Sequence, residues 1–440
     1  MVPDSPRLLL DICQEGVIDR CADQLYTWQS GRVAFPGWLN PQAEVYETLK
    51  ACSLTCRDWL YRSRHHIYSV VVFRRYDHVA SFLATVDAQP FLADHTRVLW
   101  IQVAHHYGHM RQVKLPPGLD GYIPFARKDL VQRLRNVRTL ILDVPWNRYP
   151  PGYHHSAGRY PITDLYLINE FPSPTSLFPL LRSFRNLDRL HMLPHGWHLD
   201  RSEPPHHDPW EKFSLTPKQQ KWRIQLKLLD LGSGLTQKPN FPPKGALPAS
   251  VEELALEWNP ESLLDRDLQE DALLMFLAEL RSLRKLTLIV QSFYWTETTI
   301  RSLSNWITAA LTQTQKEGSL NTITLRLFPV SGTSPRRSSP GSLQGWIRPC
   351  TTPLPAMFPY SYSVPPHEYD YWEELLSPAL REAMYGLPNL RQLHVIFASW
   401  PHRVTFFDEP ADYARWKDDI QQSLPLLRAK VSVTLNRMLP

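Results

Sequence analysis

Histidine and cysteine are the side chains of this sequence best suited to hold a metal ion, and the histidines occur in pairs. The pairs are His65/His66, His105/His106, His154/His155 and His206/His207. A metal site needs three or four ligands that converge at a fixed geometry, yet no cysteine pair stands near the later histidines. Cys52 and Cys56 have the i, i+4 spacing that places both on one helix face, where cysteine commonly packs as a small apolar residue. The sequence therefore predicts no metal site.

A second chemistry to consider is cofactor binding by the glycine-containing segment 229–234. A strand that ends in glycines allows the backbone to approach a cofactor closely, as in S-adenosylmethionine-dependent methyltransferases. Here two prolines follow where a helix is needed, and a third glycine is missing. Motifs of serine hydrolases, phosphate-binding loops and zinc proteases are also missing. We therefore expect a strand at this segment, no cofactor and no enzymatic activity, with a methyltransferase as the minor alternative.

Composition limits the compartment and the partners. The 440 residues include 43% hydrophobic residues and 15 Trp, which is enough for one small and one large domain. The net charge of +5, without a long basic run, does not favour nucleic acid as a partner. No apolar run approaches the roughly 18 residues that a membrane span requires. The five cysteines are an odd number and favour a reducing compartment, so we expect a cytoplasmic or nuclear protein.

Residues 48–68 have the pattern of one helix with two apolar faces. At about 100° per residue, one face is core-like and the other carries Leu54. A helix with two apolar faces packs against two different surfaces. The core-like arc consists of Leu49, Cys52, Cys56, Trp59 and Leu60.

A shorter amphipathic helix is expected at residues 7–21. The order of this helix and the helix at 48–68 resembles the F-box of large basidiomycete protein families, and the resemblance covers about the first seventy residues. This chain departs from that pattern at Leu9, where the family usually has proline, and in the longer link at about 23–45, which we interpret as an inserted loop. The resemblance implies docking on a Skp-type adaptor. The adaptor-binding or F-box core residues that it implies are Leu8, Leu9, Ile12, Val17, Ile18, Leu49, Cys52, Leu54, Cys56 and Trp59.

From residue 69 onward a short phrase recurs, apolar-x-x-apolar-x-apolar, often at the end of a helical stretch. Its central leucine, here called the anchor, recurs at intervals of 25 residues at Leu140, Leu165 and Leu190, and again from Leu229 to Leu254. The phrase occurs at residues 134–142, 162–167, 184–192, 251–256, 283–288, 320–325 and 390–395. Helical periodicity fills several gaps, at residues 268–283, 300–316 and 372–385.

This phrase resembles a degenerate leucine-rich repeat, which implies parallel strands on a concave face and helices on a convex one. Proline-rich insertions lengthen the later intervals, at residues 195–217, 238–248 and 329–367, the last with nine prolines. The expected fold is α/β: a small all-helical F-box unit at residues 1–68, then an irregular leucine-rich-repeat-like α/β solenoid with a parallel sheet at residues 69–440. We expect the solenoid to be one continuous array.

The resemblance implies a substrate-recognition subunit of an SCF-type cullin-RING ubiquitin ligase, which binds a protein target without catalysing a reaction. The alternative is a ligase-independent scaffold in which the helices only cap the first repeat. Along each strand the anchors point inward, so alternate positions face out. We expect segment 329–367 to cover the later strands and to leave the earlier ones open for the target. Candidate target-binding residues are Asp143, Tyr166, His191, Glu257, Arg326 and His394.

Overall fold

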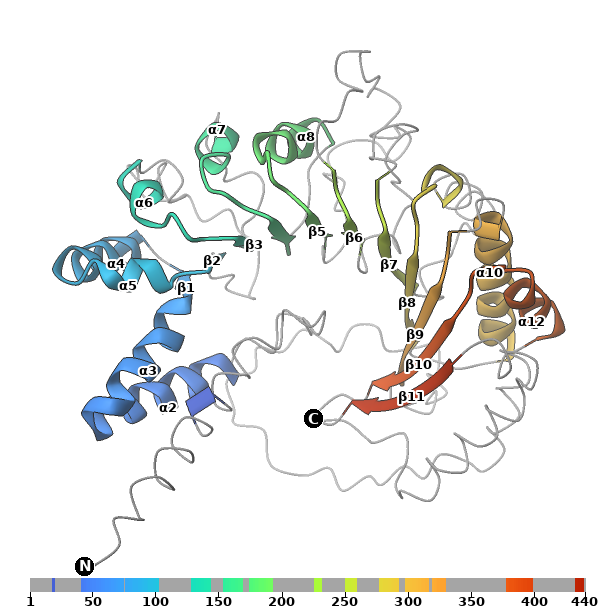
Figure 1. Ribbon diagram of the computed structural model, residues 1–440, viewed down its shortest axis with the longest axis horizontal. Helices are drawn as coiled ribbons and strands as arrows, with labels where there is room; N and C mark the ends of the chain where they lie inside the picture. The colour runs from blue at the N-terminus through green and yellow to red at the C-terminus, as the bar shows by residue number, and fades with distance from the viewer. Residues whose placement is uncertain are drawn as a thin grey trace, which may run out of the picture. The chain divides into compact units, whose positions relative to one another are not determined.

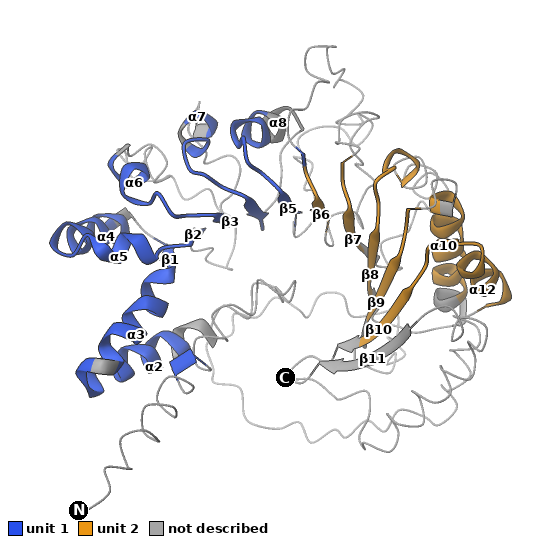
Figure 2. Cartoon of the chain, viewed as in Figure 1, with its two compact units in different colours: residues 1–207, 221–225 blue, residues 208–220, 226–440 orange. Residues whose placement is uncertain are grey.

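A computed structural model describes thirteen segments of the chain, and these form two compact units (Figure 2). Unit 1 comprises Met1–His207 and Lys221–Gln225, and unit 2 comprises Asp208–Gln220 and Leu226–Pro440. The described residues are 18–19, 41–74, 76–102, 128–143, 153–168, 174–192, 225–231, 250–258, 277–292, 297–315, 319–329, 377–398 and 432–438.

Unit 1 begins with two helices and continues as strands and helices in alternation (Figure 1). Each of its strands pairs in parallel with the next strand along the chain, and the connecting helices lie on one side of them. The helices are α2 (Pro41–Thr55), α3 (Arg57–Ser69), α4 (Tyr76–Ala88), α5 (Phe91–His95), α6 (Lys128–Arg133), α7 (Tyr153–Ala157) and α8 (Pro174–Ser183). The strands are β1 (Val70–Phe73), β2 (Val98–Gln102), β3 (Thr139–Asp143), β4 (Asp164–Leu167) and β5 (Arg189–Met192).

Unit 2 repeats the arrangement with longer strands, again parallel and paired in chain order. Its helix α12 begins at a well-formed cap, because Ser377 accepts a hydrogen bond from the amide of Leu380 at 3.3 Å and a proline follows at the first helical position. The elements are β6 (Leu228–Asp230), β7 (Glu253–Trp258), β8 (Lys285–Ser292), α10 (Glu297–Gln315), β9 (Thr322–Pro329), α12 (Pro378–Tyr385), β10 (Gln392–Ala398) and β11 (Ser432–Met438).

The α/β fold with parallel strands is therefore confirmed, and the anchor residues lie in register within each unit. Leu140 pairs with Leu165, and Leu165 pairs with Leu190. The same row continues through residues that the phrase did not reveal, because β2 and β11 lack it. The complete row is Val71, Leu99, Leu140, Leu165 and Leu190 in unit 1, and Leu229, Leu254, Leu286, Ile323, Leu393 and Val433 in unit 2.

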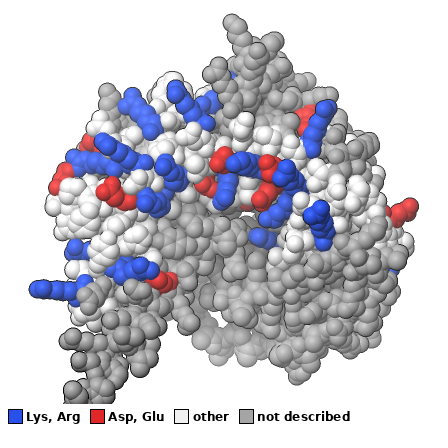
Figure 3. Space-filling model, viewed as in Figure 1, with Lys and Arg blue, Asp and Glu red and all other residues white. Residues whose placement is uncertain are grey.

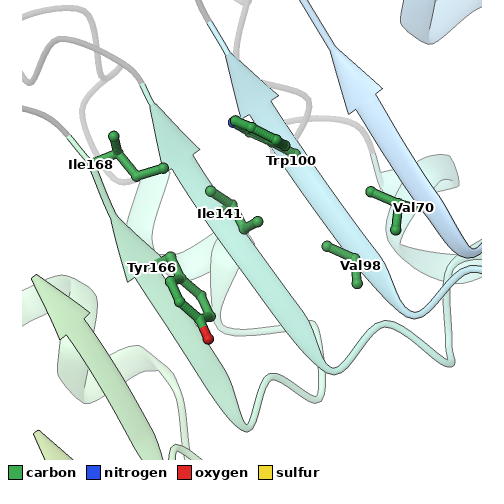
Figure 4. Packing of buried hydrophobic residues seen from close by; sticks show 6 residues of the cluster. All are labelled: Val70, Val98, Trp100, Ile141, Tyr166 and Ile168. Carbon is green, nitrogen blue, oxygen red and sulfur yellow. The ribbon is translucent and has the colours of Figure 1, made fainter. Parts of the chain in front are cut away.

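The anchor row of unit 1 faces the helices. Phe73 has the same strand parity as the anchors, and its ring packs edge-on against Phe82 of α4 with centroids 5.6 Å apart. Alternate residues point to the opposite side of the strands, here called the free face. There a second buried cluster forms, drawn in Figure 4: Val70, Val98, Trp100, Ile141, Tyr166 and Ile168. The strands of unit 1 thus bury side chains on both faces.

Successive repeats are joined just before each strand by a recurring backbone motif. The carbonyl of Arg97 accepts two hydrogen bonds from the next repeat, from the amide of Arg138 at 2.9 Å and from that of Thr139 at 3.1 Å. This forked contact fixes the strand register in addition to the ladder itself. The carbonyls that accept in the same way are those of Arg138, Thr163, Lys227, Glu252, Arg284 and Asn321.

Several expectations about individual elements are changed by the structure. The single helix at residues 48–68 is wrong: α2 begins earlier, at Pro41, and the helix breaks at Cys56, whose backbone is extended with φ −156° and ψ 169°. The helix at 300–316 is confirmed as α10, and that at 372–385 is confirmed from Pro378 onward. Of the helix at 268–283, the described part is helical only at residues 277–279. The insertions at 195–217 and 238–248, and that at 329–367 beyond Pro329, lie outside the described residues.

Candidate functional site

The pair of helices α2 and α3 carries most of the predicted adaptor-binding residues. Its core forms where Ile18, Leu49 and Cys52 pack together, each less than a tenth exposed. Burial of such side chains is the main stabilising term for a small helical unit. The remaining members of this cluster are Val45, which is buried, and the partly buried Tyr46, Trp59 and Ile67.

An ionic clamp ties the turn at Ile18 and Asp19 to α3. Arg62 donates two hydrogen bonds to the Asp19 carboxylate, at 2.9 and 2.7 Å, and His66 Nε2 lies 2.9 Å from the same group. The guanidinium of Arg62, more than the His66 ring, lowers the pKa of Asp19 from 3.8 to about 2 although partial burial opposes this. A bidentate pair of this kind restrains orientation, so the clamp fixes how the first turn meets α3.

The outer side of the helix pair is apolar at one position. Leu54, in the last turn of α2, is 86% exposed, and Cys56 at the break is exposed as well. Trp59 is half-buried and packs on the core of the helix pair. The structure thus places Ile18, Leu49 and Cys52 inside and Leu54 and Cys56 outside. The prediction that Cys56 lies on the buried face with Cys52 is wrong, because α2 ends before Cys56 and its extended backbone takes it out of the helical phase. The other predicted members of this site, Leu8, Leu9, Ile12 and Val17, lie outside the described residues.

The helix pair is also bonded to the first strands of unit 1. The hydroxyl of Tyr46 in α2 donates to the carbonyl of Val70, the first residue of β1, and α3 runs into that strand without a linker. Between α3 and α5, the Nδ1 atoms of His65 and His95 lie 3.2 Å apart. Burial and then the adjacent His95 ring lower the pKa of His65 below its ordinary 6.5, so the His65 ring is neutral in this contact at neutral pH.

Three of the predicted target-binding residues lie on the free face of unit 1, and all are buried. We expected this region to be open; instead Asp143, Tyr166 and His191 are 4%, 4% and 7% exposed. The rings of Tyr166 and His191 stack, with centroids 4.0 Å apart and planes 2° from parallel. Asp143 accepts a hydrogen bond from Gln102 at 3.1 Å, and Gln102 accepts one from Arg74 at 2.9 Å.

The other three candidates belong to unit 2. Arg326 in β9 and His394 in β10 are both half-buried, so part of each side chain reaches the surface. Glu257 of β7 occupies the position equivalent to Arg326, because both pair with Ile289 of β8. The register therefore brings the unit 2 candidates onto one strand face, as predicted from the alternation, while their binding role stays a prediction.

The described segments contain neither a metal-binding cluster nor a membrane-spanning helix. Within them, no group of three or more His, Cys, Asp or Glu side chains is arranged to hold a metal ion. None of the helices that the structure describes is long and apolar enough to cross a bilayer. The segment 229–234 begins in β6 and pairs with β7 as a repeat strand, and its glycines lie outside the described residues.

Two functional features escaped sequence reasoning. The clamp between Asp19 and Arg62 joins residues far apart in the chain, and no local pattern signals it. The forked backbone motif depends on register, although aligning the repeated phrases on their anchors would have placed Arg138 and Thr163 in one column. Comparison with known proteins adds no assignment, because no protein-family description matches the chain and no curated protein is significantly similar to it.

Proposed function

We propose that this protein is the substrate-recognition subunit of an SCF-type cullin-RING ubiquitin ligase, with an F-box that docks a Skp-type adaptor and leucine-rich-repeat-like strands that bind a protein target. The exposure of Leu54 carries the proposal. It gives α2 an apolar contact on the side opposite its buried residues Leu49 and Cys52. A helix with a buried face and a separate exposed leucine fits the two-faced pattern expected of an adaptor-binding helix.

The clamp supports the proposal by holding this surface ready for binding. Asp19, Arg62 and His66 hold the residues at Ile18 against α3, and Ile18 packs in turn on Leu49 and Cys52 of α2 before any partner arrives. Binding energy is then not consumed in ordering the helices, which raises affinity for a given contact area. The register of the anchor row supports the repeat assignment, since the leucines occupy equivalent positions on successive strands.

The proposed mechanism is one of proximity rather than chemistry. Because Tyr46 bonds directly to Val70 and α3 continues into β1, an adaptor bound to the helices would be held at a fixed distance from the first strands. A target bound to the strands is then presented to a ubiquitin-loaded enzyme at high effective concentration. The receptor itself needs no catalytic residue for this.

Capture of a purified Skp-type adaptor by the full-length chain tests the proposal. We expect the wild type to retain the adaptor and Leu54→Asp to lose at least about 90% of it, because a carboxylate placed in an apolar contact is costly to desolvate. Phe91→Asp is the matched control: it removes another exposed apolar side chain, 45% exposed on α5, and should leave capture unchanged. Equal capture by both variants would reject the assigned surface, provided circular dichroism shows both to be folded.

A ligase-independent scaffold is the second candidate, and one observation favours it. The same bond from Tyr46 to Val70 makes the helices a cover for the start of the strand array, as a terminal cap requires. The capture experiment separates the two functions. If the wild-type chain fails to bind the adaptor, the helices serve only as a cap.

A further inference from the structure

The forked backbone motif places the residues that precede each strand of unit 1 side by side along one edge. The amide of Arg138 donates to the carbonyl of Arg97, that of Thr163 to Arg138, and that of Asp188 to Thr163, at 2.9, 2.8 and 2.8 Å. Neighbouring strands are about 4.8 Å apart, so these positions form a closely spaced row. The turns before the strands join the same edge, because the Asn136 amide donates to the carbonyl of Asp94 at 3.1 Å.

Exposed arginines are concentrated on this edge. Five of them, here called the arginine edge, are Arg97, Arg135, Arg138, Arg159 and Arg185. Figure 3 shows Lys and Arg side chains gathered over the part of unit 1 that carries β2 to β5, with fewer acidic side chains among them. Guanidinium groups that outnumber the carboxylates beside them repel one another and favour an anionic ligand.

The internal contacts of the arginine edge leave most of its donors available. Arg135 donates to the carbonyl of Gln132 at 2.9 Å, and Arg138 donates one bond to the carbonyl of Pro161 at 3.3 Å. None of the five arginines forms an ion pair within the part of the chain that the structure describes. The nearby carboxylate of Asp164 is engaged by Thr163 at 2.6 Å and by Arg189 at 3.4 Å.

Two cations at the equivalent edge of unit 2 face acids on the adjacent strand. Arg284 lies 3.6 Å from Glu252, and Lys285 lies 3.1 Å from Glu253. Arg189 and Asp164 form the same kind of pair in unit 1. The arginine edge therefore consists of the unit 1 arginines that take no part in such a pair among the described residues.

We propose that the arginine edge of unit 1 binds an acidic polypeptide segment. Guanidinium groups hold carboxylates with paired hydrogen bonds, and side chains on one side of an extended peptide repeat about every 7 Å, which long arginines on strands about 4.8 Å apart can follow. This deepens the proposed function by naming the chemistry of the target. It requires no adaptor, so the two proposals can fail separately.

An acidic peptide fits this edge better than a nucleic acid does. Single nucleic-acid strands are held by base stacking on exposed aromatics as well as by charge. The large exposed apolar side chains of the described residues are Leu54, Tyr61 and Phe91, none of which lies in the turns that form the edge.

Fluorescence anisotropy with the full-length chain, without adaptor, tests the proposal. The probes are a labelled ten-residue polyglutamate and, for comparison, a labelled ten-nucleotide oligothymidine, at about 50 mM salt. We expect saturable binding of the peptide, and affinity roughly tenfold lower for Arg97→Glu/Arg138→Glu, since opposed charges become like charges. The control Arg57→Glu/Arg391→Glu makes the same change in net charge at two exposed arginines elsewhere, and should change affinity by less than about twofold.

Each other outcome overturns the proposal. No peptide binding by the wild type, or equal losses in the two double variants, would mean that the edge is not a site. Tighter binding of oligothymidine than of polyglutamate would assign it to nucleic acid instead. None of these results bears on capture of the adaptor through Leu54.

Discussion

The free faces of the two units can be compared position by position, because both have the same parallel register. In unit 1 the row beside the anchors is bulky: Trp100, Ile141, Tyr166 and His191. In unit 2 the equivalent row is small or polar: Asp230, Ala255, Thr287, Thr324 and His394. The anchor rows behind them consist of leucine, isoleucine or valine, and from β1 to β10 they are buried.

This difference separates what folding requires from what is free to vary. The anchors must fill the space between strands and helices in every repeat, so leucine or isoleucine recurs there from β2 through β10. The free face varies in side-chain type. In unit 1 it is a second apolar core, while in unit 2 the buried side chains beside the anchors include Asp230, Thr287 and Thr324. Among the predicted target-binding residues, Arg326 and His394 of unit 2 therefore remain reachable by a partner, while Tyr166 and His191 do not.

Truncating one side chain on each free face should reveal the largest difference in stability between the two units. Trp100, 3% exposed, belongs to the unit 1 cluster, and we expect Trp100→Ala to lower the free energy of unfolding by about 3–5 kcal/mol. His394→Ala, at a half-buried position of unit 2, should change it by less than about 0.5 kcal/mol. Urea unfolding followed by circular dichroism measures both. Similar losses in the two variants would show that the faces are energetically alike.

A second test concerns how tightly the helices of each unit are packed. A Cβ atom at Gly158, after α7, would lie 2.5 Å from the carbonyl oxygen of Ser183, so Gly158→Ala should destabilise unit 1 by about 1–3 kcal/mol. Gly386, after α12 in unit 2, has φ −68°, which alanine adopts readily. Gly386→Ala should be neutral or stabilising by up to about 1 kcal/mol. A thermal shift assay ranks the two variants, and loss of stability in Gly386→Ala would contradict this account.

A third and smaller effect is specific to the clamp of unit 1. Because the pKa of Asp19 is about 2 when folded and 3.8 ordinarily, the unfolded chain binds its proton more tightly. The clamp therefore stabilises the folded state fully at pH values above 3.8. This stabilisation is lost as the pH falls through about 2. Both partners are partly exposed, so we expect only about 0.2–1 kcal/mol. Asp19→Asn and Arg62→Met should remove the same part of the acid dependence of unfolding. A steeper dependence in either variant would refute the assignment.

Much of the fold could be predicted from the sequence because its strongest signal is local and periodic. The constant interval between Leu140, Leu165 and Leu190 predicts a strand at each of them, and in the structure these residues pair on neighbouring strands. The strand β2 was missed because Thr96 stands where the recurring phrase has its first apolar residue. The break at Cys56 was missed because apolar residues continue across it on the expected helical face.

The site was less predictable because its parts depend on contacts between distant residues. Leu54 was correctly placed outside by helical phase alone. The burial of Tyr166 and His191 was not foreseen, because alternation gives the side of a strand but not what packs upon it. The arginine edge likewise exists only once the register places Arg97 beside Arg138.

Hydrogen–deuterium exchange of the full-length chain with and without a Skp-type adaptor tests the central claim most directly. We predict that the adaptor slows amide exchange around Leu54 and Cys56, at the junction of α2 and α3, and leaves the strands of unit 2 unchanged. Exchange at this junction that stays the same in a saturated complex, or protection confined to the strands, would contradict an adaptor site on the helices.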